Sequence, residues 1–474
     1  MKGRTWMAAG LLLSWGLYTY FFPSTPHLSP LTHLALPAGP VVIFAPHSDD
    51  ETLPTGGLIQ QLVADGAPPY VVLVTPGDAF TVAAEAAYHV VHPSPSVMQQ
   101  FGAQRLAESH AAMTHLGVPE DHYIFLGFPD QTLNRLWLEC WQPTAPCTSR
   151  TTDAQAVPYP QALRPGAPYA GQELLDQLVT VLRQVKPALV VYPHPNEAHV
   201  DHWGLSNFVT AALEQLRRTD TDWRPPTEWY YLVHRGDWPA PKGYRPNSGL
   251  LPPPKLAGGM TVWRSEPLTA AQERKKAESV DLYHTQTRIL RRYMESFIRT
   301  NELYGSISRV QVSPTGPVSH TGSTAPPWGD LDWAEVITDP RADTVAREVE
   351  RGADLLSVWA ASDGRTLYLA AQMATRPLKP VDARFSLRSY NRDAGWSELT
   401  SSRVLPDGTH VVDPKVPPAI GAAITSSAQG TWLRFSVPLG ALGNPQALMV
   451  NVETRVNNVL IDRSAWRPVS LDGR

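Results

Sequence analysis

The chain has 474 residues, which is too long for one compact domain and indicates two or three. Lys plus Arg total 40 and Asp plus Glu total 44, so the net charge is close to zero. This balance gives neither the basic surface of a nucleic-acid-binding protein nor an acidic tail, and we expect no nucleic-acid partner. The 46 prolines and 15 tryptophans indicate long ordered loops and a β-rich portion.

The N-terminus has the pattern of a membrane-targeting segment, residues 1–24. Lys2 and Arg4 precede an apolar run over residues 6–22, long enough for a signal peptide or a marginal membrane span. Because no small-x-small cleavage site follows, the pattern favours an uncleaved membrane anchor over a cleaved signal peptide. In both cases the rest of the chain, after a linker at 25–38, is expected on the extracytoplasmic face of the cell envelope. A buried N-terminal helix is the alternative.

Residues 39–311 alternate between apolar strand-like runs and segments with helical periodicity. The predicted strands are 40–45, 70–75, 123–126 and 188–192, and the predicted helices are 56–63, 98–116, 172–185, a helix from about His202, and 268–304. This alternation predicts a Rossmann-like α/β fold, with a mostly parallel sheet and flanking helices. Ligands of such sheets bind beyond the carboxyl ends of the strands. Residues 131–170 form a long Pro-, Thr- and Ala-rich insertion after one strand end.

The C-terminal part has a different periodicity. A Ser/Thr/Pro/Gly linker at 312–327 precedes short period-two runs with turn signals over 328–474, which predict an all-β sandwich. Trp328, Trp333, Trp396 and Trp466 are candidates for sugar stacking, but core or linker packing is the favoured interpretation. The two cysteines of the chain, Cys140 and Cys147, lie in a Pro-rich loop, where an exported protein is expected to form a local disulfide; free thiols are the alternative.

Two clusters of His and Asp follow predicted strands. The first is His47-Ser48-Asp49-Asp50-Glu51, where crowded carboxylates need a cation among them; the second runs from His194 to His202. A catalytic zinc site uses about three protein ligands and leaves one position open for water. His47, Asp50 and His202 supply such a set, and Asp49 would point toward the water.

This arrangement resembles the PIG-L / LmbE-like family of zinc-dependent N-acetylglucosaminyl deacetylases. Pro46 to Glu51 is similar to the family signature Ala-His-Pro-Asp-Asp-Glu, and His199-Val200-Asp201-His202 is similar to His-x-Asp-His. Weaker similarities include Arg105, Glu108, residues 116–118, residues 125–130, and Lys276 followed by residues 283–286. The resemblance covers roughly residues 38–305. The sandwich weakly resembles family 9-like carbohydrate-binding modules.

The resemblance implies roles for several residues of the two clusters. His47, Asp50 and His202 would bind Zn²⁺, and Asp49 would be the general base. His199, paired with Asp201, would be protonated, stabilise the oxyanion and assist amine departure. Arg105 and Asp130 would hold sugar hydroxyls, and the partner would be an N-acetylated amino-sugar glycan, glycolipid or glycoconjugate.

Some features depart from the family pattern or leave alternatives open. Ser48 replaces a proline of the first signature. Glu197 and Ala198 stand where some members have a tyrosine. Without that tyrosine, either another group polarises the carbonyl of the substrate amide or His199 does so alone. His194 is interpreted as a strand-end hydrogen-bonding residue rather than a fourth ligand. Iron(II) suits the same ligands as zinc. The alternatives to an N-deacetylase are an amidase for a larger amide conjugate and a non-catalytic glycan-binding envelope protein.

Overall fold

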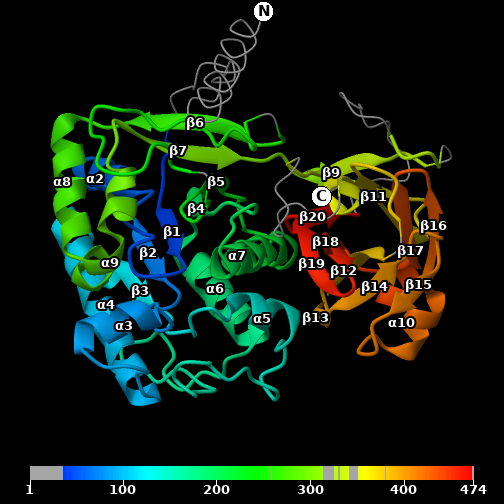
Figure 1. Cartoon of the computed structure of the whole chain (residues 1–474), viewed down its shortest axis with the longest axis horizontal. Helices are drawn as coiled ribbons and strands as arrows, with labels where there is room; N and C mark the ends of the chain where they lie inside the picture. Colours follow the sequence, from blue (N-terminus) through cyan, green and yellow to red (C-terminus); the bar gives the residue numbers. More distant parts are fainter. Residues whose placement is uncertain are drawn as a thin grey trace, which may run out of the picture.

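The computed structural model describes residues 36–471, except for 237, 258, 313–324, 329–330, 341–350 and 379. The predicted anchor at 1–24 lies outside the described residues, as do most of the linker at 25–38 and most of the linker at 312–327. Among the residues that are described, no helix is long and apolar enough to cross a membrane. The described chain forms an α/β domain and a β-sandwich that lie side by side (Figure 1).

The sheet of the α/β domain is mostly parallel, as predicted. Its strands are β1 Val41–Ala45, β2 Tyr70–Leu73, β3 Tyr123–Phe125, β4 Leu189–Pro193, β5 Thr227–Tyr231, β6 Val262–Pro267 and β7 Asn301–Ser306, in the order β3-β2-β1-β4-β5-β7-β6. The first five strands are parallel, and β7 and β6 add an antiparallel edge. The prediction missed β5, β6 and β7, because their runs mix charged residues with aromatic ones.

Helices cover both faces of this sheet (Figure 1). They are α2 Gly56–Ala64, α3 Thr81–Tyr88, α4 Pro95–Leu116, α5 Leu133–Leu138, α6 Gly171–Val185, α7 Val200–Thr219, α8 Ala270–Asp281 and α9 His284–Met294. Successive residues of β1 point to opposite faces: Val41 and Ile43 belong to one hydrophobic core, and Val42 and Phe44 to the other. Burial on both faces explains why β1 is a continuous apolar run.

The single long helix predicted over 268–304 is wrong. Tyr283 has non-helical backbone angles and separates α8 from α9, and the segment ends in strand β7. The break turns Tyr283 inward, where its hydroxyl lies 2.7 Å from Glu51 Oε1 and 2.7 Å from Thr52 Oγ1. The break therefore provides support for the loop that follows β1.

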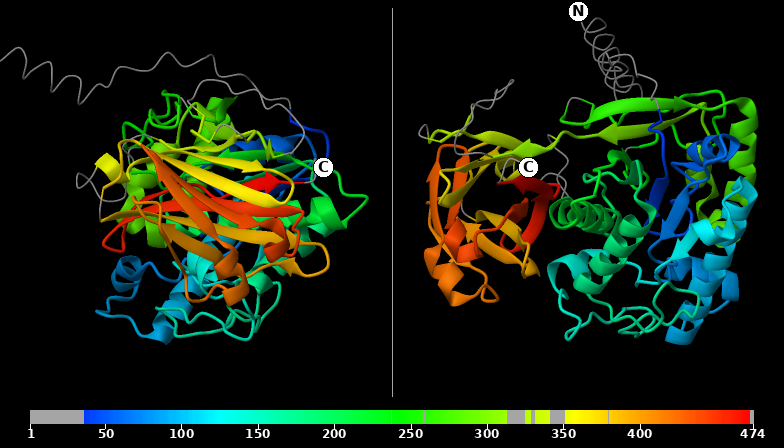
Figure 2. Two further views of the ribbon diagram at one scale, coloured as in Figure 1. Left: turned by 90° about the vertical axis from the view of Figure 1, so that its right-hand side faces the viewer. Right: turned by 180° about the vertical axis from the view of Figure 1, so that it is seen from behind.

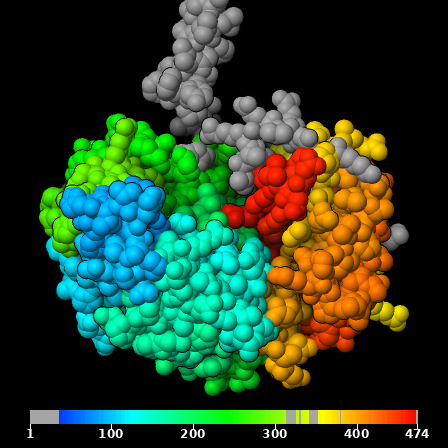
Figure 3. Space-filling view, turned by 60° about the horizontal axis from the view of Figure 1, so that its bottom comes forward, coloured from blue at the N-terminus to red at the C-terminus, as the bar shows by residue number. Residues whose placement is uncertain are grey.

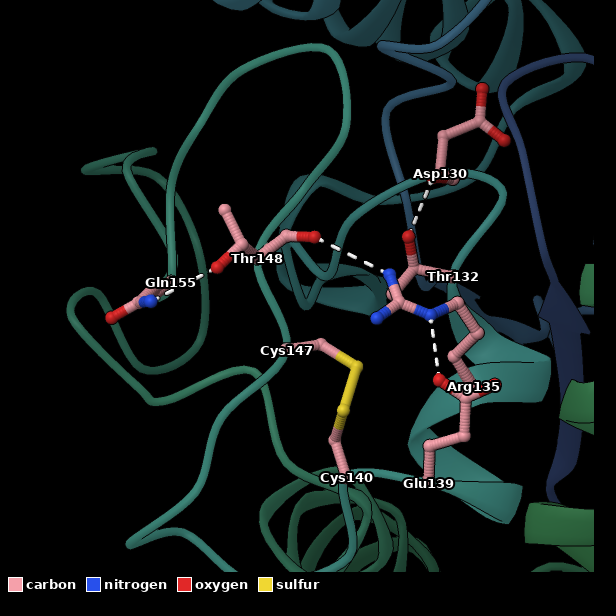
Figure 4. Close-up of a disulfide and its surroundings, with 8 residues drawn as sticks. All are labelled: Asp130, Thr132, Arg135, Glu139, Cys140, Cys147, Thr148 and Gln155. Carbon is pink, nitrogen blue, oxygen red and sulfur yellow. Dashed lines mark hydrogen bonds and ion pairs between the residues drawn. A yellow bond between two sulfur atoms is a disulfide. The ribbon is translucent and has the colours of Figure 1, made fainter.

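The insertion at 131–170 contains the predicted disulfide. Cys140 and Cys147 are bonded, with their Cα atoms 5.5 Å apart, directly after α5 (Figure 4). Arg135 of α5 donates from Nε to Glu139 and lies beside the bridge. The bridge closes the loop that follows α5. Asp130 lies just before α5 in the chain, at the carboxyl edge of the sheet (Figure 4).

The C-terminal domain is a β-sandwich, as predicted. One sheet has the order β16-β17-β11-β10-β9, and the other has the order β15-β14-β12-β18-β20-β8, with β13 and β19 beside it. Its strands are β8 Val310–Gln311, β9 Ala334–Thr338, β10 Leu355–Ser362, β11 Thr366–Met373, β12 Val381–Asn391, β13 Gly395–Trp396, β14 Thr400–Val404, β15 His410–Val412, β16 Thr425–Gln429, β17 Trp432–Pro438, β18 Ala447–Val456, β19 Val459–Arg463 and β20 Arg467–Ser470. Because β8 pairs with β20, the sandwich includes residues before the predicted boundary at 311.

The two domains lie against each other (Figures 2 and 3), and side chains of both are buried where they meet. The fully buried Arg388 guanidinium of β12 lies 3.9 Å from the ring centroid of Trp141 and 5.0 Å from that of Trp137. Trp396 and Trp466 of the sandwich belong to the same hydrophobic core as Trp137. These two tryptophans therefore pack rather than stack on sugars, and the insertion carries the surface that receives the sandwich.

Candidate metal centre

The candidate ligands converge at the carboxyl ends of β1 and β4. His47 Nδ1 lies 3.0 Å from Asp50 Oδ2, and His202 Nε2 lies 2.9 Å from the same oxygen. All three side chains are buried or nearly so. His47 and Asp50 follow β1, whereas His202 comes from the first turn of α7, which follows β4. The parallel pairing of β1 with β4 brings the two clusters together, as the sequence predicts.

The arrangement fits a divalent cation better than a hydrogen-bond network. Although His202 Nε2 is close to Asp50, neither ring nitrogen of His202 has hydrogen-bond geometry to any described residue, and buried Asp50 Oδ1 also has no hydrogen-bond partner there. Buried polar atoms are normally satisfied, so lone pairs that converge in this way indicate a shared ion. The ligand atoms of His47, Asp50, His202 and His234 all lie within 4.8 Å of one another.

Two carboxylates hold the His47 ring in the orientation needed for metal binding. Asp130 Oδ1 and Asp201 Oδ2 each lie 3.1 Å from His47 Nε2. Burial lowers the pKa of His47, but Asp130 and the other carboxylates outweigh it and raise this pKa well above its usual value. With Nε2–H donated to these carboxylates, Nδ1 is the nitrogen that would lose its proton and bind a metal on the side of Asp50.

This geometry corrects part of the predicted pairing of Asp201 with His199: the Asp201 backbone N–H donates to His199 Nδ1 at 3.3 Å, but the carboxylate points elsewhere. The Asp201 carboxylate binds the His47 ring and accepts from the backbone N–H groups of Gln131 and Leu133, the latter at 2.8 Å. Gly204 permits this close approach of α7 to the first residues of α5, because a Cβ at that position would lie 2.8 Å from the backbone of Leu133 and Asn134. Asp201 therefore positions His47.

Glu197 supports the third ligand, a role that was not predicted from the sequence. Its Oε1 lies 3.4 Å from His202 Nδ1. The same oxygen accepts hydrogen bonds from the backbone N–H groups of Val233 and His234, the latter at 3.1 Å. Burial lowers the pKa of His202, but Asp50 and then Glu197 raise it to about 9. A carboxylate behind a ligating histidine fixes the ring and increases its basicity.

Replacing Glu197 by Gln is expected to weaken metal binding by about 10- to 100-fold, because the amide keeps the size of the side chain and loses its charge. Competition with a chromogenic chelator measures the affinity directly. Glu120→Gln, at an exposed position, is the matched control. An unchanged affinity in the Glu197 variant would refute the positioning role.

Asp49 adopts a backbone conformation with φ of 114°, which is rare for a residue with a side chain. Its backbone N–H donates to Glu51 Oε2 at 3.0 Å, and Glu51 Oε1 accepts from the hydroxyls of Ser109 and Tyr283. Burial, followed by Asp50, raises the pKa of Asp49 well above its usual range, and Arg105 opposes the shift. A carboxylate with a raised pKa beside a metal set suits proton transfer.

Arg105 and Asp130 make their contacts within the protein itself. Arg105 donates from Nη1 to the Gly77 carbonyl at 2.6 Å and from Nη2 to the Ser48 carbonyl at 2.8 Å, and Nη2 lies 4.0 Å from Asp49. Gly77 has φ of 75°, and any Cβ there would lie 1.8 Å from the Arg105 guanidinium. Arg105 therefore braces the loop that carries Asp49, and the predicted sugar contacts of both residues stay predictions.

Two further histidines face the metal set. His199 lies 4.7 Å from His47 between ring centroids, and His234, which follows β5, lies 4.9 Å from His199 and 4.7 Å from His202. His234 Nε2 is 3.8 Å from Asp50 Oδ1, and its side chain is 32% exposed. The sequence interpretation missed His234. The aromatic run at 227–231, recognised as a strand of the parallel sheet, would have placed it at the same edge.

The surroundings of His199 disfavour the protonated state predicted for it. Burial and the neighbouring His47 and His202 lower the pKa of His199 to about 3. His194 is the predicted strand-end hydrogen-bonding residue: its Nε2 lies 2.9 Å from Thr261 Oγ1, and its Nδ1 accepts from the Asn196 backbone. His194 is outside the ligand set.

The sheet and its His/Asp cluster define an α/β domain with a candidate metal centre at the carboxyl edge. Residues 42–213 match the family model described as PIG-L: GlcNAc-PI de-N-acetylase, and this part of the chain is a PIG-L family domain. The match includes the residues of both clusters, but not His234.

Curated relatives carry the name 1D-myo-inositol 2-acetamido-2-deoxy-alpha-D-glucopyranoside deacetylase. The Mycobacterium sp. (strain KMS) protein is 30% identical over 195 residues, which are 40% of this chain and 53% of that protein. The protein of Actinosynnema mirum is 32% identical over 174 residues, 35% of this chain and 52% of that protein. The chain thus spans about half the length of these relatives.

Solved structures show weaker likeness. The N,N'-diacetylchitobiose deacetylase of Pyrococcus horikoshii is 16% identical with a TM-score of 0.36, over 56% of this chain and 82% of that one. A family 9 carbohydrate-binding module from Caldicellulosiruptor kristjanssonii is 14% identical with a TM-score of 0.23, over 35% of this chain and 97% of that one. With TM-scores this low, neither likeness carries information on activity or ligand.

Proposed function

We propose that this protein is a zinc-dependent hydrolase that removes the N-acetyl group from an N-acetylglucosamine-type sugar conjugate. The observation that carries the proposal is the convergence of His47, Asp50 and His202, with Asp49 beside them. A bound zinc ion supplies Lewis acidity toward a water molecule and the amide carbonyl. The matched family model and the names of the curated relatives support deacetylation as the reaction class.

Asp49 accepts the proton of the attacking water in this proposal. Burial and Asp50 raise its pKa above that of an ordinary aspartate, which makes the carboxylate a better proton acceptor for the attacking water. Arg105 holds the loop through Ser48, and Glu51 holds the backbone of Asp49. These contacts fix the direction of the carboxylate.

His199 and His234 donate hydrogen bonds to the carbonyl oxygen as it becomes negative. Both rings face the metal set, and His234 is partly exposed, as a substrate contact requires. In this proposal His234 acts in place of the tyrosine found in some family members. Donors aimed at a developing charge stabilise the transition state more than the ground state.

Replacing His234 by Phe is expected to lower kcat by about 10²-fold, the usual cost of one lost oxyanion donor. Phe keeps the ring that stacks on Tyr293, with centroids 5.9 Å apart, so folding should be retained. Metal content is measured on the same samples. An unchanged kcat would rule out the role, and loss of metal would identify His234 as a ligand instead.

We also propose that the protein is exported and that it meets a glycan, glycolipid or glycoconjugate in the cell envelope. The charged and apolar pattern of residues 2–22 and the bonded Cys140–Cys147 pair support this location, because disulfides persist in oxidising compartments. Anchoring of the chain to the membrane by residues 6–22 is part of this proposal.

A panel of acylated amino sugars tests the function. The panel contains N-acetylglucosamine, its β-linked oligomers and its inositol conjugate, each with an acetyl or a longer acyl group, and the released acid is quantified. We expect acetate release to exceed the release of longer acids. Preferential release of a longer acid would identify an amidase for larger conjugates, and release from none of the panel would refute the proposal.

A further inference from the structure

The domain junction contains a cavity of about 560 Å³ that is separate from the metal ligands. The α/β domain contributes Asn196, Lys255 and Thr261 to its walls, and the sandwich contributes Thr338, Ser357 and Gln372. We propose that this cavity is a second carbohydrate subsite, which binds a neutral sugar unit linked to the N-acetylated residue at the metal centre. This inference rests on the proposed function and extends it to the part of the substrate beyond the reacting sugar.

The walls of the cavity have the chemistry of a neutral, hydroxyl-rich ligand. Two basic and two acidic side chains balance one another: Lys255 and Arg467 against Glu335 and Asp339. Gln372 accepts from the Ser357 hydroxyl at 3.2 Å through Oε1, and its amide N–H donors take no part in that bond. A sugar needs donors and acceptors around its hydroxyls, together with apolar contacts for its C–H faces. The apolar contacts come from a set of side chains at the cavity wall: Leu256, Met260, Ile307 and Leu356.

One wall of the cavity belongs to the loop between β4 and α7, next to the metal centre in the sequence. Asn196 donates its backbone N–H to His194 Nδ1 at 3.1 Å, and His194 Nε2 lies 2.9 Å from Thr261 Oγ1. Asn196 and Thr261 both line the cavity. The next residue, Glu197, supports the ring of His202. One short loop therefore forms a cavity wall and supports a candidate metal ligand, which places the two sites next to each other along the chain.

The cavity is preformed because the domain junction is fixed elsewhere. Arg388 packs against the rings of Trp137 and Trp141 and donates to the Trp137 and Ser397 carbonyls. Within the cavity, the Ser357 hydroxyl accepts from the Trp359 indole at 2.9 Å, which fixes its position. A site whose walls are already in place binds without an ordering cost. The sandwich thus completes the substrate site instead of serving as a separate binding module.

Met260→Trp tests the inference, because this substitution fills the cavity without touching a candidate catalytic or metal-binding residue. Gln372→Ala removes the amide donors with a smaller change in volume. The matched controls are Leu378→Trp, at an exposed position on the sandwich, and Gln429→Ala, at an exposed position on β16. The measurement is kcat/KM for N-acetylglucosamine and for tri-N-acetylchitotriose, a neutral trisaccharide.

We expect each cavity variant to lower kcat/KM for the trisaccharide by about tenfold or more, the effect of losing ~1.4 kcal/mol of binding. In the same variants, kcat/KM for N-acetylglucosamine should change by less than about twofold. The control variants should change kcat/KM for both substrates by no more than that. Equal losses on both substrates, or no loss on either, would overturn the subsite.

Titration calorimetry with the full-length Asp49→Asn protein separates this inference from the proposed function. If no sugar is deacetylated by the wild type, but Met260→Trp still weakens trisaccharide binding to the Asp49→Asn protein, the proposed activity fails and the subsite stands. If the trisaccharide binds equally well with the cavity filled, the subsite fails whatever the activity.

Discussion

Replacing Asp49 by Asn is expected to reduce kcat by about 10²- to 10⁴-fold while the metal content stays unchanged. The amide keeps the shape of the side chain but cannot accept a proton at neutral pH. Asp49 lies outside the groups of side chains that can hold an ion, so metal binding has no reason to fall. Initial rates and metal analysis on the same preparation measure both quantities.

The matched control is Asp65→Asn, which removes an exposed carboxylate at the end of α2. Its activity should equal that of the wild type. A turnover of the Asp49 variant within a fewfold of the control would remove Asp49 from the proposed mechanism. Loss of metal from the Asp49 variant would instead make this residue a ligand.

Replacing Lys276 by Met is expected to destabilise the α/β domain by about 3–5 kcal/mol. Lys276 Nζ lies 2.7 Å from Glu302 Oε1, and both side chains are fully buried. Glu302 also accepts from the backbone N–H groups of Gly57 and Leu58 at the start of α2. Removing the cation leaves an uncompensated carboxylate in the core, under the helix that follows the metal loop.

Arg291→Met is the control for this stability effect. Arg291 Nη1 lies 2.6 Å from Asp281 Oδ1, almost the same distance, but both side chains are more than half exposed. The control should lose less than about 1 kcal/mol. Urea unfolding followed by circular dichroism compares the two variants, and equal midpoints would contradict the role of burial.

The sequence allowed the two halves of the metal set to be predicted, because each half is local. His47 and Asp50 are three residues apart after one apolar strand, and His202 begins the helix after another. The parallel sheet predicted from the alternating pattern then brings these strand ends to one edge. No long-range side-chain contact was needed for that prediction.

The remaining parts of the site depend on contacts that the sequence does not encode locally. His234 requires β5 to be placed beside β4, and β5 lacks the uniform apolar character of a central strand. Arg105 looked like a sugar contact, but only the fold shows that its guanidinium reaches the carbonyls of Gly77 and Ser48. In the same way, Asp201 was paired with its sequence neighbour His199, whereas the start of α7 turns its carboxylate toward His47.

The most direct test of the account is metal removal and restoration with acetate release measured on one sample. The protein is stripped with a chelator, assayed on N-acetylglucosamine conjugates, and then titrated with Zn²⁺ while the bound metal is counted. The account predicts that activity disappears with the metal and returns in proportion to one ion per chain, and that the Asp50→Ala protein recovers neither. Undiminished acetate release from metal-free protein, or full recovery in the Asp50 variant, would contradict it.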